Sequence, residues 1–357
     1  MSHSRAPYME WAKTRPKPEV DLAGSNLLAC TLEDLPGARE AVDIAGESPD
    51  GYPPLLDAIA RHHGVGPERV ATAGGCSGAT FLAFAAILSP GDDVLFESPG
   101  YDPLPGAATL LGARVRTFER RFEDGYALDP DVVAAALTPA TRLVVLSNPH
   151  NPSGALASPE SIARLANLAE ALGFYVLVDE VYRETVLEDR PHPAALHSEQ
   201  VVSTSSLTKS YGLAALRCGW AIASADLTAA IRRARDVVDV WSPMPADRLS
   251  VVAFRNIDRL AARTRAIVAA NSATVERFLA SQPALRAAPS RSTLVFPRLA
   301  GTDDAGPFVE KLFRETGTAV SPGRFFGAPA HFRLAFGGDP AALQRGLGAL
   351  ERGLKGV

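Results

Sequence analysis

The chain has 357 residues, of which 46% are hydrophobic and 21% are charged, so it can bury a large core and is not a disordered polymer. Its formal net charge of -4, with no long basic block, excludes an electrostatic case for nucleic acid or an anionic membrane as partner. The odd count of three cysteines, Cys30, Cys76 and Cys218, argues against a disulfide framework. No secretory signal core or bilayer-length apolar run is found, so we expect a cytoplasmic protein.

A glycine-rich turn precedes the first strongly apolar helix pattern of the chain. "GGCSGAT" (74–80) leads into "FLAFAAIL" (81–88), and small residues there allow backbone N–H groups to face a ligand. The N-terminus of a helix favours an anion such as phosphate. The turn does not match the dinucleotide-binding, P-loop or nucleophile-elbow patterns, so it predicts only an anion site.

The middle of the chain alternates apolar β-branched runs with Ala/Leu-rich stretches. The helix pattern 158–173 opens with Ser158 and Pro159 and closes on Gly173, which are typical start and stop signals. The apolar runs predict strands buried on both faces, at 93–99, 142–149, 174–180, 201–206 and 218–224. This order predicts an α/β fold, with a three-layer α/β/α large domain and a mostly parallel sheet over residues 36–244.

The pattern changes after about residue 240. A long Arg/Ala-rich helical region (246–281) is followed by two strand-like runs, "STLVFPRL" and "HFRLAFGG", and by a final helix at 339–354. We expect residues 245–357 to form a smaller α+β C-terminal domain. The first 35 residues carry few regular signals, and we expect them to form an N-terminal arm that packs on this small domain.

Polar side chains follow three of the predicted strands directly. Asn151 follows the strand that ends near residue 147, Asp179 with Tyr182 follows the next, and Lys209 follows the run "VVSTSS". Taken singly, these residues are explained by turn chemistry, a helix cap and a solvated lysine. Ligands of open α/β sheets bind at the carboxyl ends of strands, so their joint placement there favours a functional site.

Two other chemistries find little support in the sequence. Ser206 and Lys209 match the S-x-x-K pattern of serine acyl-enzymes, but the partner motifs of that class are missing. The adjacent His62 and His63 point in different directions, and no His or Cys cluster has ligand spacing, so no metal site is predicted.

Six motifs in order, between about residues 50 and 338, resemble those of fold-type I pyridoxal-phosphate (PLP) enzymes, in the class I/II aminotransferase family. They are "GYPPLLDAIARHHG" (51–64), "PGYD" (99–102), "NPHNPSG" (148–154), "DEVY" (179–182), "SLTKSYGLAALRCGW" (206–220) and "FRLAFG" (332–337). The resemblance implies pyridoxal 5'-phosphate as cofactor. It also implies a homodimer.

The resemblance assigns the catalytic roles. Lys209 would form the Schiff base with the cofactor and then move the substrate's α-proton, for which its pKa must be lowered by poorly solvating neighbours and a nearby cation such as Arg217. Asp179 would pair with the pyridine nitrogen. Asn151 and Tyr182 would hydrogen-bond the phenolic oxygen of the cofactor.

The remaining assignments concern the rest of the cofactor and the substrate. Tyr101 would stack on the ring. Arg333 would hold the substrate α-carboxylate bidentately, with Asn151 also on the substrate side. The phosphate would be bound by Cys76, Ser77, Gly78, Ser206 and Arg217.

Two stretches depart from the family pattern. Gly46 stands where many relatives carry a tyrosine that reaches the neighbouring subunit's phosphate, so either the local alignment shifts or that contact is absent. Gly24, Ser25 and Asn26 of the arm are candidates for substrate contacts.

We therefore expect an aminotransferase that moves an amino group between an L-amino acid and a 2-oxo acid. The same residues would serve a β-lyase, a cyclase acting on an arginine-like substrate, a synthase of specialised metabolism or a racemase, so these alternatives stay open. A PLP-binding sensor without turnover is a further alternative. Neither nucleic acid nor a membrane is expected as a partner.

Overall fold

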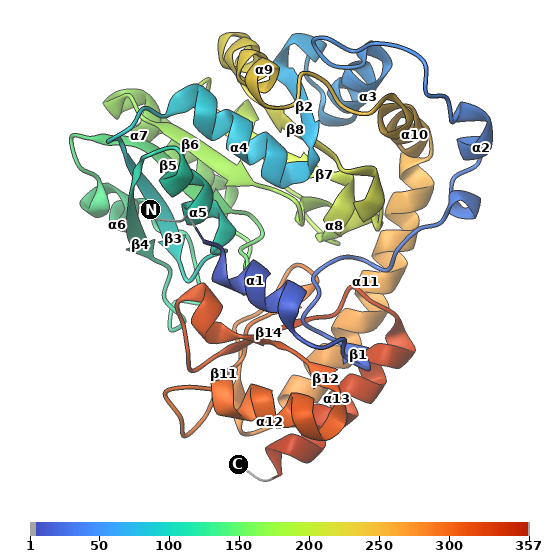
Figure 1. Ribbon diagram of the computed structural model, residues 1–357. Helices are drawn as coiled ribbons and strands as arrows, with labels where there is room; N and C mark the ends of the chain where they lie inside the picture. Colours follow the sequence, from blue (N-terminus) through green and yellow to red (C-terminus); the bar gives the residue numbers. More distant parts are fainter. Residues whose placement is uncertain (1–4, 356–357) are drawn as a thin grey trace.

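The computed structural model describes residues 5–355 (Figure 1). Residues 1–4 of the predicted arm and residues 356–357 of the predicted C-terminal domain lie outside the described residues. In Figure 1 the large sheet and its helices fill the upper part of the view, and the C-terminal segments lie below them.

Seven strands form one mixed sheet in the order β2-β8-β7-β6-β5-β3-β4. Every neighbouring pair is parallel except the two made by β8, which is antiparallel to β2 and to β7. The mostly parallel sheet is therefore confirmed, whereas β2 and β4 were not predicted. The strands are β2 (Val70–Gly74), β3 (Asp93–Ser98), β4 (Arg114–Glu119), β5 (Thr141–Ser147), β6 (Tyr175–Asp179), β7 (Val201–Ser206) and β8 (Cys218–Ile222).

Helices cover both faces of this sheet, which explains why its strands read as continuous apolar runs. On β5, Leu143 and Val145 pack with α4, α5 and α9, whereas Val144 and Leu146 pack with α6 and α7. This alternation is the expected three-layer α/β/α arrangement. The covering helices are α4 (Gly75–Ile87), α5 (Pro103–Leu110), α6 (Pro130–Ala136), α7 (Pro159–Leu172) and α9 (Ala225–Val238).

The helix predicted at 158–173 is α7, and its end signals work as expected. Ser158 Oγ accepts the backbone N–H of Ser161 at 3.1 Å, and Pro159 is the first helical residue. Gly173 ends the helix with φ 77°, a conformation that glycine adopts without strain.

The predicted helical region 246–281 consists of two helices, α10 (Met244–Arg255) and α11 (Ile257–Ala280). The break lies at Asn256, whose side-chain amide donates to Val252 O at 2.9 Å and to Pro36 O at 3.3 Å. Asparagine favours such local bonds over helix continuation.

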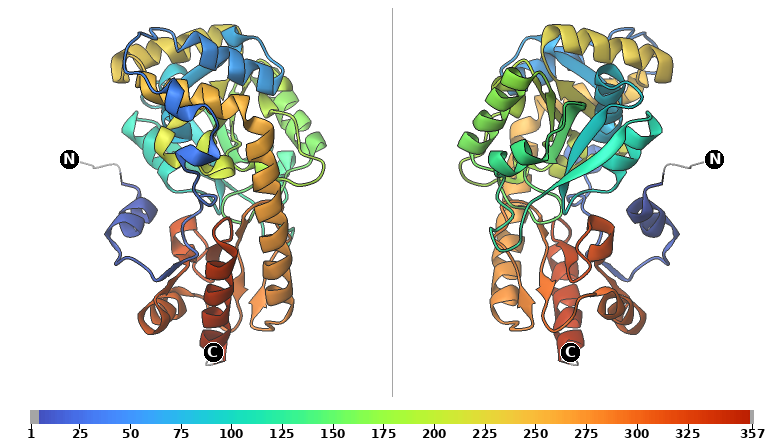
Figure 2. Two further views of the ribbon diagram at one scale, coloured as in Figure 1. Left: turned by 90° about the vertical axis from the view of Figure 1, so that its right-hand side faces the viewer. Right: turned by 90° about the vertical axis from the view of Figure 1, so that its left-hand side faces the viewer.

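The long helix α11 runs from the sheet side to the C-terminal side, as both views of Figure 2 show. By contrast, α10 packs in one apolar cluster with α3 (Pro53–His63) and with Trp220 of β8. The helices α2 (Ala38–Ala41) and α8 (Leu207–Tyr211) complete the sheet side. A domain division at residues 244 and 245 stays a prediction, and the packing of α10 suggests a boundary within α11.

A second core lies among α11, α12, α13 and short strands. The predicted final helix is α13, and the two predicted strand-like runs contain β10, β11 and β14. The C-terminal elements are β9 (Leu285–Arg286), β10 (Leu294–Val295), β11 (Arg298–Leu299), α12 (Gly306–Thr316), β12 (Thr318–Ala319), β13 (Ser321–Pro322), β14 (Phe332–Ala335) and α13 (Pro340–Leu354). Strand β14 lies between β10 and β13 and is antiparallel to both.

The N-terminal stretch holds more regular structure than its sequence indicates. It forms α1 (Pro7–Thr14) and β1 (Val20–Asp21), and β1 pairs in parallel with β12. Within residues 5–355, no helix is both long enough and apolar enough to span a membrane.

The backbone of β8 at Gly219 lies very close to the backbone at the start of α4. A Cβ atom there would lie 2.1 Å from the carbonyl carbon of Gly75, the first residue of α4. We expect Gly219→Ala to lower the free energy of unfolding by about 2 kcal/mol, because backbone would have to move. Urea denaturation measures this change.

Gly348→Ala is the matched control, because a Cβ at this position in α13 would meet only the Arg352 side chain, at 3.7 Å. Alanine should there raise the free energy of unfolding by up to about 1 kcal/mol. Equal stability of the two variants would contradict the packing argument.

Candidate active site

The residues singled out at the strand ends come together at the carboxyl edge of the sheet. Asp179 ends β6, Asn151 lies four residues after β5, and Lys209 lies in α8 directly after β7. Arg333 reaches them from β14 on the C-terminal side, and its Nη1 donates to Asn151 Oδ1 at 2.9 Å. This hydrogen bond joins the two halves of the molecule at the candidate site.

Lys209 is the amine at the centre of this site. Its Nζ donates to Ser25 Oγ at 3.0 Å and to Asn26 Oδ1 at 2.8 Å, so two arm residues contact it directly. Burial, and after it the positive charge of Arg333, lower the pKa of Lys209 to about 8. Arg217 also lowers this pKa, but it contributes less than Arg333. The sequence had indicated only Arg217 as the cation that lowers the pKa of Lys209.

Asp179 is buried and interacts electrostatically with Lys209. Its Oδ1 accepts the backbone N–H of Val181 at 3.1 Å and the thiol of Cys76 at 3.5 Å. Burial raises the pKa of Asp179, while these hydrogen bonds and the nearby Lys209 charge lower it. A cationic group that donated to Asp179 would favour the ionised carboxylate further.

The N-terminus of α4 has no capping side chain, and an arginine lies beside it. The N-cap residue is Gly74, and Arg217 Nη2 donates to its carbonyl oxygen at 3.2 Å. A Cβ on Gly75, which has φ +81°, would lie only 2.3 Å from Arg217 Nη2. The guanidinium therefore lies beside the free helix terminus, an arrangement that suits an anion. The first turn of α4 contains the predicted residues Cys76, Ser77 and Gly78.

Three further predicted residues lie around this set. Ser206 caps α8, and its Oγ accepts the backbone N–H of Thr208 at 3.3 Å. Tyr182 is buried with its hydroxyl near Ser25, and burial raises its pKa to about 12. Tyr101 turns toward the arm, where its hydroxyl donates to Met9 Sδ at 3.4 Å.

Arg333 is fully buried, yet all its hydrogen-bond acceptors are neutral. Its Nη2 donates to Tyr8 Oη at 2.6 Å and to Ala23 O at 3.0 Å, and the rings of Tyr8 and Phe326 flank the guanidinium at 5.0 and 4.8 Å. Within residues 5–355 it makes no ion pair with a carboxylate, and its Nε is unpaired. A buried cation without a counter-ion is costly, so this pocket suits an anionic ligand.

The arm contributes more to the site than the sequence indicated. Ser25 and Asn26 contact Lys209, whereas the backbone N–H of Gly24 donates to Asp21; substrate contacts of these three residues stay a prediction. Tyr8 was missed altogether. An aromatic cluster within an otherwise polar N-terminal segment, "PYMEW", was the available signal.

A buried ion pair that the sequence reasoning missed supports Asn151. Glu97 accepts from Arg120 Nη1 at 2.7 Å and from the backbone N–H of Ser147 at 2.7 Å. Ser147 Oγ in turn accepts the backbone N–H of Asn151 at 2.8 Å. His150, isolated in sequence, is buried and bonds to Pro99 O through Nε2 at 2.8 Å. These contacts hold the loop after β5 in place.

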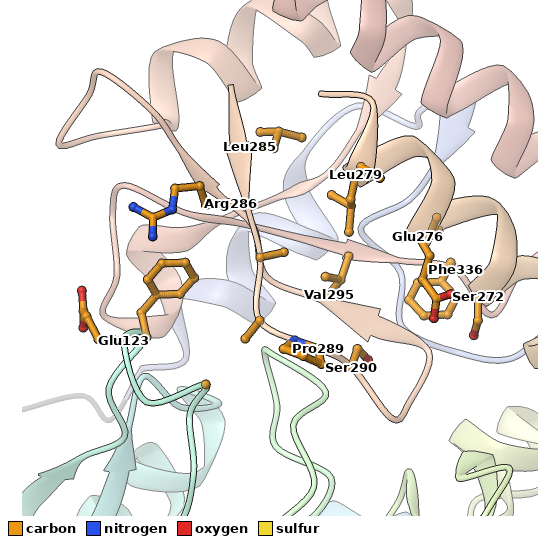
Figure 3. Close-up of a pocket in the computed structure, with 16 residues that line it drawn as sticks. Glu123, Ser272, Glu276, Leu279, Leu285, Arg286, Pro289, Ser290, Val295 and Phe336 are labelled. Carbon is orange, nitrogen blue, oxygen red and sulfur yellow. The ribbon is translucent and has the colours of Figure 1, made fainter. Parts of the chain in front are cut away.

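A cavity of about 810 Å³ lies elsewhere, among α11, β9 and β10. Figure 3 shows Ser272 and Glu276 of α11 on one side of it and Glu123 and Arg286 on the other. None of its lining residues is among the predicted site residues. The cavity is therefore separate from the candidate active site.

Comparison with known proteins agrees with this geometry. A family model described as aminotransferase class I and II matches residues 43–350. Capreomycidine synthase of Streptomyces vinaceus is 33% identical over 365 aligned residues, which cover 98% of this chain and 93% of that protein. Aspartate/prephenate aminotransferase of Thermus thermophilus is 30% identical, with 85% of this chain and 81% of the relative covered.

The crystal structure of a PLP-dependent aminotransferase from Streptococcus suis has the same fold. It superposes with a TM-score of 0.93 at 25% identity, over 99% of this chain and 98% of that one. The chain therefore belongs to the class I and II aminotransferases, a fold-type I family of pyridoxal 5'-phosphate enzymes.

Proposed function

We propose that this enzyme moves an amino group between an L-amino acid and a 2-oxo acid. The observation that carries the proposal is the pairing of a buried arginine that lacks a counter-ion with a lysine of lowered pKa. Arg333 and Lys209 lie in one site, and Asn151 bonds to the arginine. An amino acid or a 2-oxo acid supplies the carboxylate that such an arginine needs.

The residues present fit the family's cofactor. The free N-terminus of α4 with Arg217 and Ser206 suits the phosphate, and buried Asp179 suits the protonated ring nitrogen. Asn151 and Tyr182 offer hydrogen bonds to the phenolic oxygen, and Tyr101 an aromatic face. When bound, pyridoxal phosphate supplies an electron sink for the electron pair left at the substrate Cα.

Lys209 would carry the cofactor and then move the α-proton. Its pKa of about 8 leaves part of the amine neutral near neutral pH, and only the neutral amine accepts a proton. Ser25 and Asn26 hold Nζ by two hydrogen bonds and so fix its direction. Arg333 would grip the carboxylate bidentately, which fixes the bond at Cα that breaks.

A second candidate function is synthesis or cyclisation of a modified amino acid. The observation that favours it is the 33% identity to capreomycidine synthase along nearly the whole chain. The proposed roles of Lys209, Asp179 and Arg333 would serve both reactions, because both start with the loss of a proton at Cα. The groups around the substrate side chain would then decide the product.

We further propose a homodimer in the cytoplasm. Large apolar side chains are strongly exposed on two segments, with Ile44 86% and Val237 88% exposed. Arg248 of α10 binds Ala45 O at 3.0 Å and so holds one segment against the start of α10. We propose that these two segments form the dimer interface, because exposed apolar surface often marks a site of protein association. The three cysteines are free thiols, as suits a reducing compartment.

Borohydride reduction tests the role of Lys209. The purified protein should be yellow, and reduction followed by digestion and mass spectrometry should find the cofactor on Lys209. Lys209→Ala should lose this adduct and at least about a hundredfold in kcat, because no other amine replaces the base. Lys311→Ala, on the surface of α12, is the control and should keep both; an adduct on another lysine would refute the assignment.

A single-turnover panel of amino acids separates the two candidate functions. Without any acceptor, an aminotransferase should release one 2-oxo acid per active site and retain the amino group on the cofactor. A product that keeps its amino nitrogen in a new ring would favour the second candidate. Continuous release of pyruvate and ammonia from a β-substituted amino acid would contradict both and indicate a β-lyase.

Sedimentation tests the homodimer. The wild-type protein should sediment as a dimer, and the double variant Ile44→Asp/Val237→Asp should sediment as a monomer, because charges would be buried in the apolar interface. Leu110→Asp/Leu172→Asp changes two exposed leucines outside these segments and should leave the dimer intact. A monomeric wild type would refute the proposal.

A further inference from the structure

The N–H donors of Arg333 are unevenly occupied. An arginine has five donors: one on Nε and two on each terminal nitrogen. Nη2 makes two short hydrogen bonds, to Tyr8 Oη at 2.6 Å and to Ala23 O at 3.0 Å, and a long one to Ser321 Oγ at 3.5 Å. Nη1 makes one, to Asn151 Oδ1. Nε has no acceptor among the described residues. Both donors of Nη2 are therefore in use.

A bidentate carboxylate cannot bind to this arrangement without a change. Carboxylates bind two parallel N–H groups, either of Nε and Nη2 or of Nη1 and Nη2, so Nη2 takes part in both modes. One of the two close acceptors on Nη2 must therefore give way. Ala23 O is a backbone atom that Ser321 Oγ also approaches at 3.3 Å, and the N–H of Ala23 donates to Asp21. The acceptor that can move is Tyr8.

Tyr8 has a fixed body and an adaptable hydroxyl. Its backbone N–H donates to Asp102 Oδ2 at 2.8 Å, and its ring packs against Tyr101 and Phe326 at centroid distances of 5.9 and 5.5 Å. The acceptor for its own O–H is Ala23 O, at the long distance of 3.5 Å. This proton is thus weakly held and can be redirected to a better acceptor.

We propose that Tyr8 is a substrate-binding residue that holds Arg333 before substrate arrives and then donates to the substrate carboxylate. The hydroxyl first accepts from Nη2; when a carboxylate oxygen takes that donor, the Tyr8 O–H turns to the same oxygen. The inference rests on the proposed function in one respect, the assignment of the carboxylate to Arg333. Through Tyr8, the N-terminal arm would take part in binding the substrate carboxylate.

The test measures carboxylate binding to the holoenzyme without turnover. Trp11 lies 6.1 Å from the Tyr8 ring, so its fluorescence can follow a titration with pyruvate. Tyr8→Phe keeps the ring packing and removes only the hydroxyl. We expect its dissociation constant for pyruvate to rise about tenfold or more, as for a lost hydrogen bond to a charged group.

Tyr126→Phe is the matched control. Tyr126 belongs to the same aromatic cluster, is also buried, and has a hydroxyl without a hydrogen-bond partner in the described chain. It should bind pyruvate as the wild type does. Acetone, which lacks the carboxylate, should bind no more weakly to Tyr8→Phe than to the wild type.

A double variant shows whether Tyr8 acts together with Arg333. In an Arg333→Lys background, which cannot bind bidentately, Tyr8→Phe should weaken pyruvate binding by much less than in the wild type. Equal effects in both backgrounds would overturn the proposed sharing. In steady-state assays, Tyr8→Phe should raise KM more than it lowers kcat, because a carboxylate contact persists from substrate to transition state.

The outcomes separate this inference from the proposed function. If the wild type and Tyr8→Phe bind pyruvate equally, the role of Tyr8 is refuted while amino transfer can stand. If the wild type binds pyruvate tightly but transfers no amino group, the carboxylate site stands and the proposed function fails. If the wild type does not bind pyruvate at all, the carboxylate role of Arg333 and the role of Tyr8 both fail.

Discussion

The arrangement depends on keeping two cations buried in one site that contains a single carboxylate, Asp179. Arg333 makes charging Lys209 less favourable, and the pKa of the lysine falls because a guanidinium does not lose its proton in proteins. Neutral acceptors from the arm, Ser25 and Asn26 for the lysine and Tyr8 for the arginine, compensate part of the lost hydration. The site therefore combines an amine of lowered pKa with a buried arginine that has no anionic partner among the described residues.

The sheet brings the residues of the site together. Parallel strands place their carboxyl ends along one edge, so the residues that follow the neighbouring strands β5, β6 and β7 lie close together. The sheet alone does not fix the loop after β5, which is also held by the buried ion pair of Glu97 and Arg120. Such a pair is weak evidence for stability, and its value here is to hold the Asn151 loop in one geometry.

Much of the fold could be predicted because the buried strands are continuous apolar runs and α7 has both end signals. The strand β4 was missed because it is mostly exposed at the sheet edge, and "RVRTFE" has no apolar run. The division at Asn256 depends on a contact with Pro36, which is distant in sequence. In the site, the positions after predicted strands and the family resemblance of the motifs singled out Lys209 and Asp179. They could not identify Tyr8 or Glu97, whose positions follow from packing across elements far apart in the chain.

The parallel pairing of β1 with β12 has a mechanical consequence. It attaches the arm to the C-terminal side, while Lys209 belongs to the sheet side. A hinge motion that swung the C-terminal side outward would withdraw Ser25 and Asn26 from the amine and admit water in their place. Opening would raise the proton affinity of Lys209, and closing would lower it again. The basicity of the amine would thereby depend on the position of an arm segment that is 184 residues away along the chain.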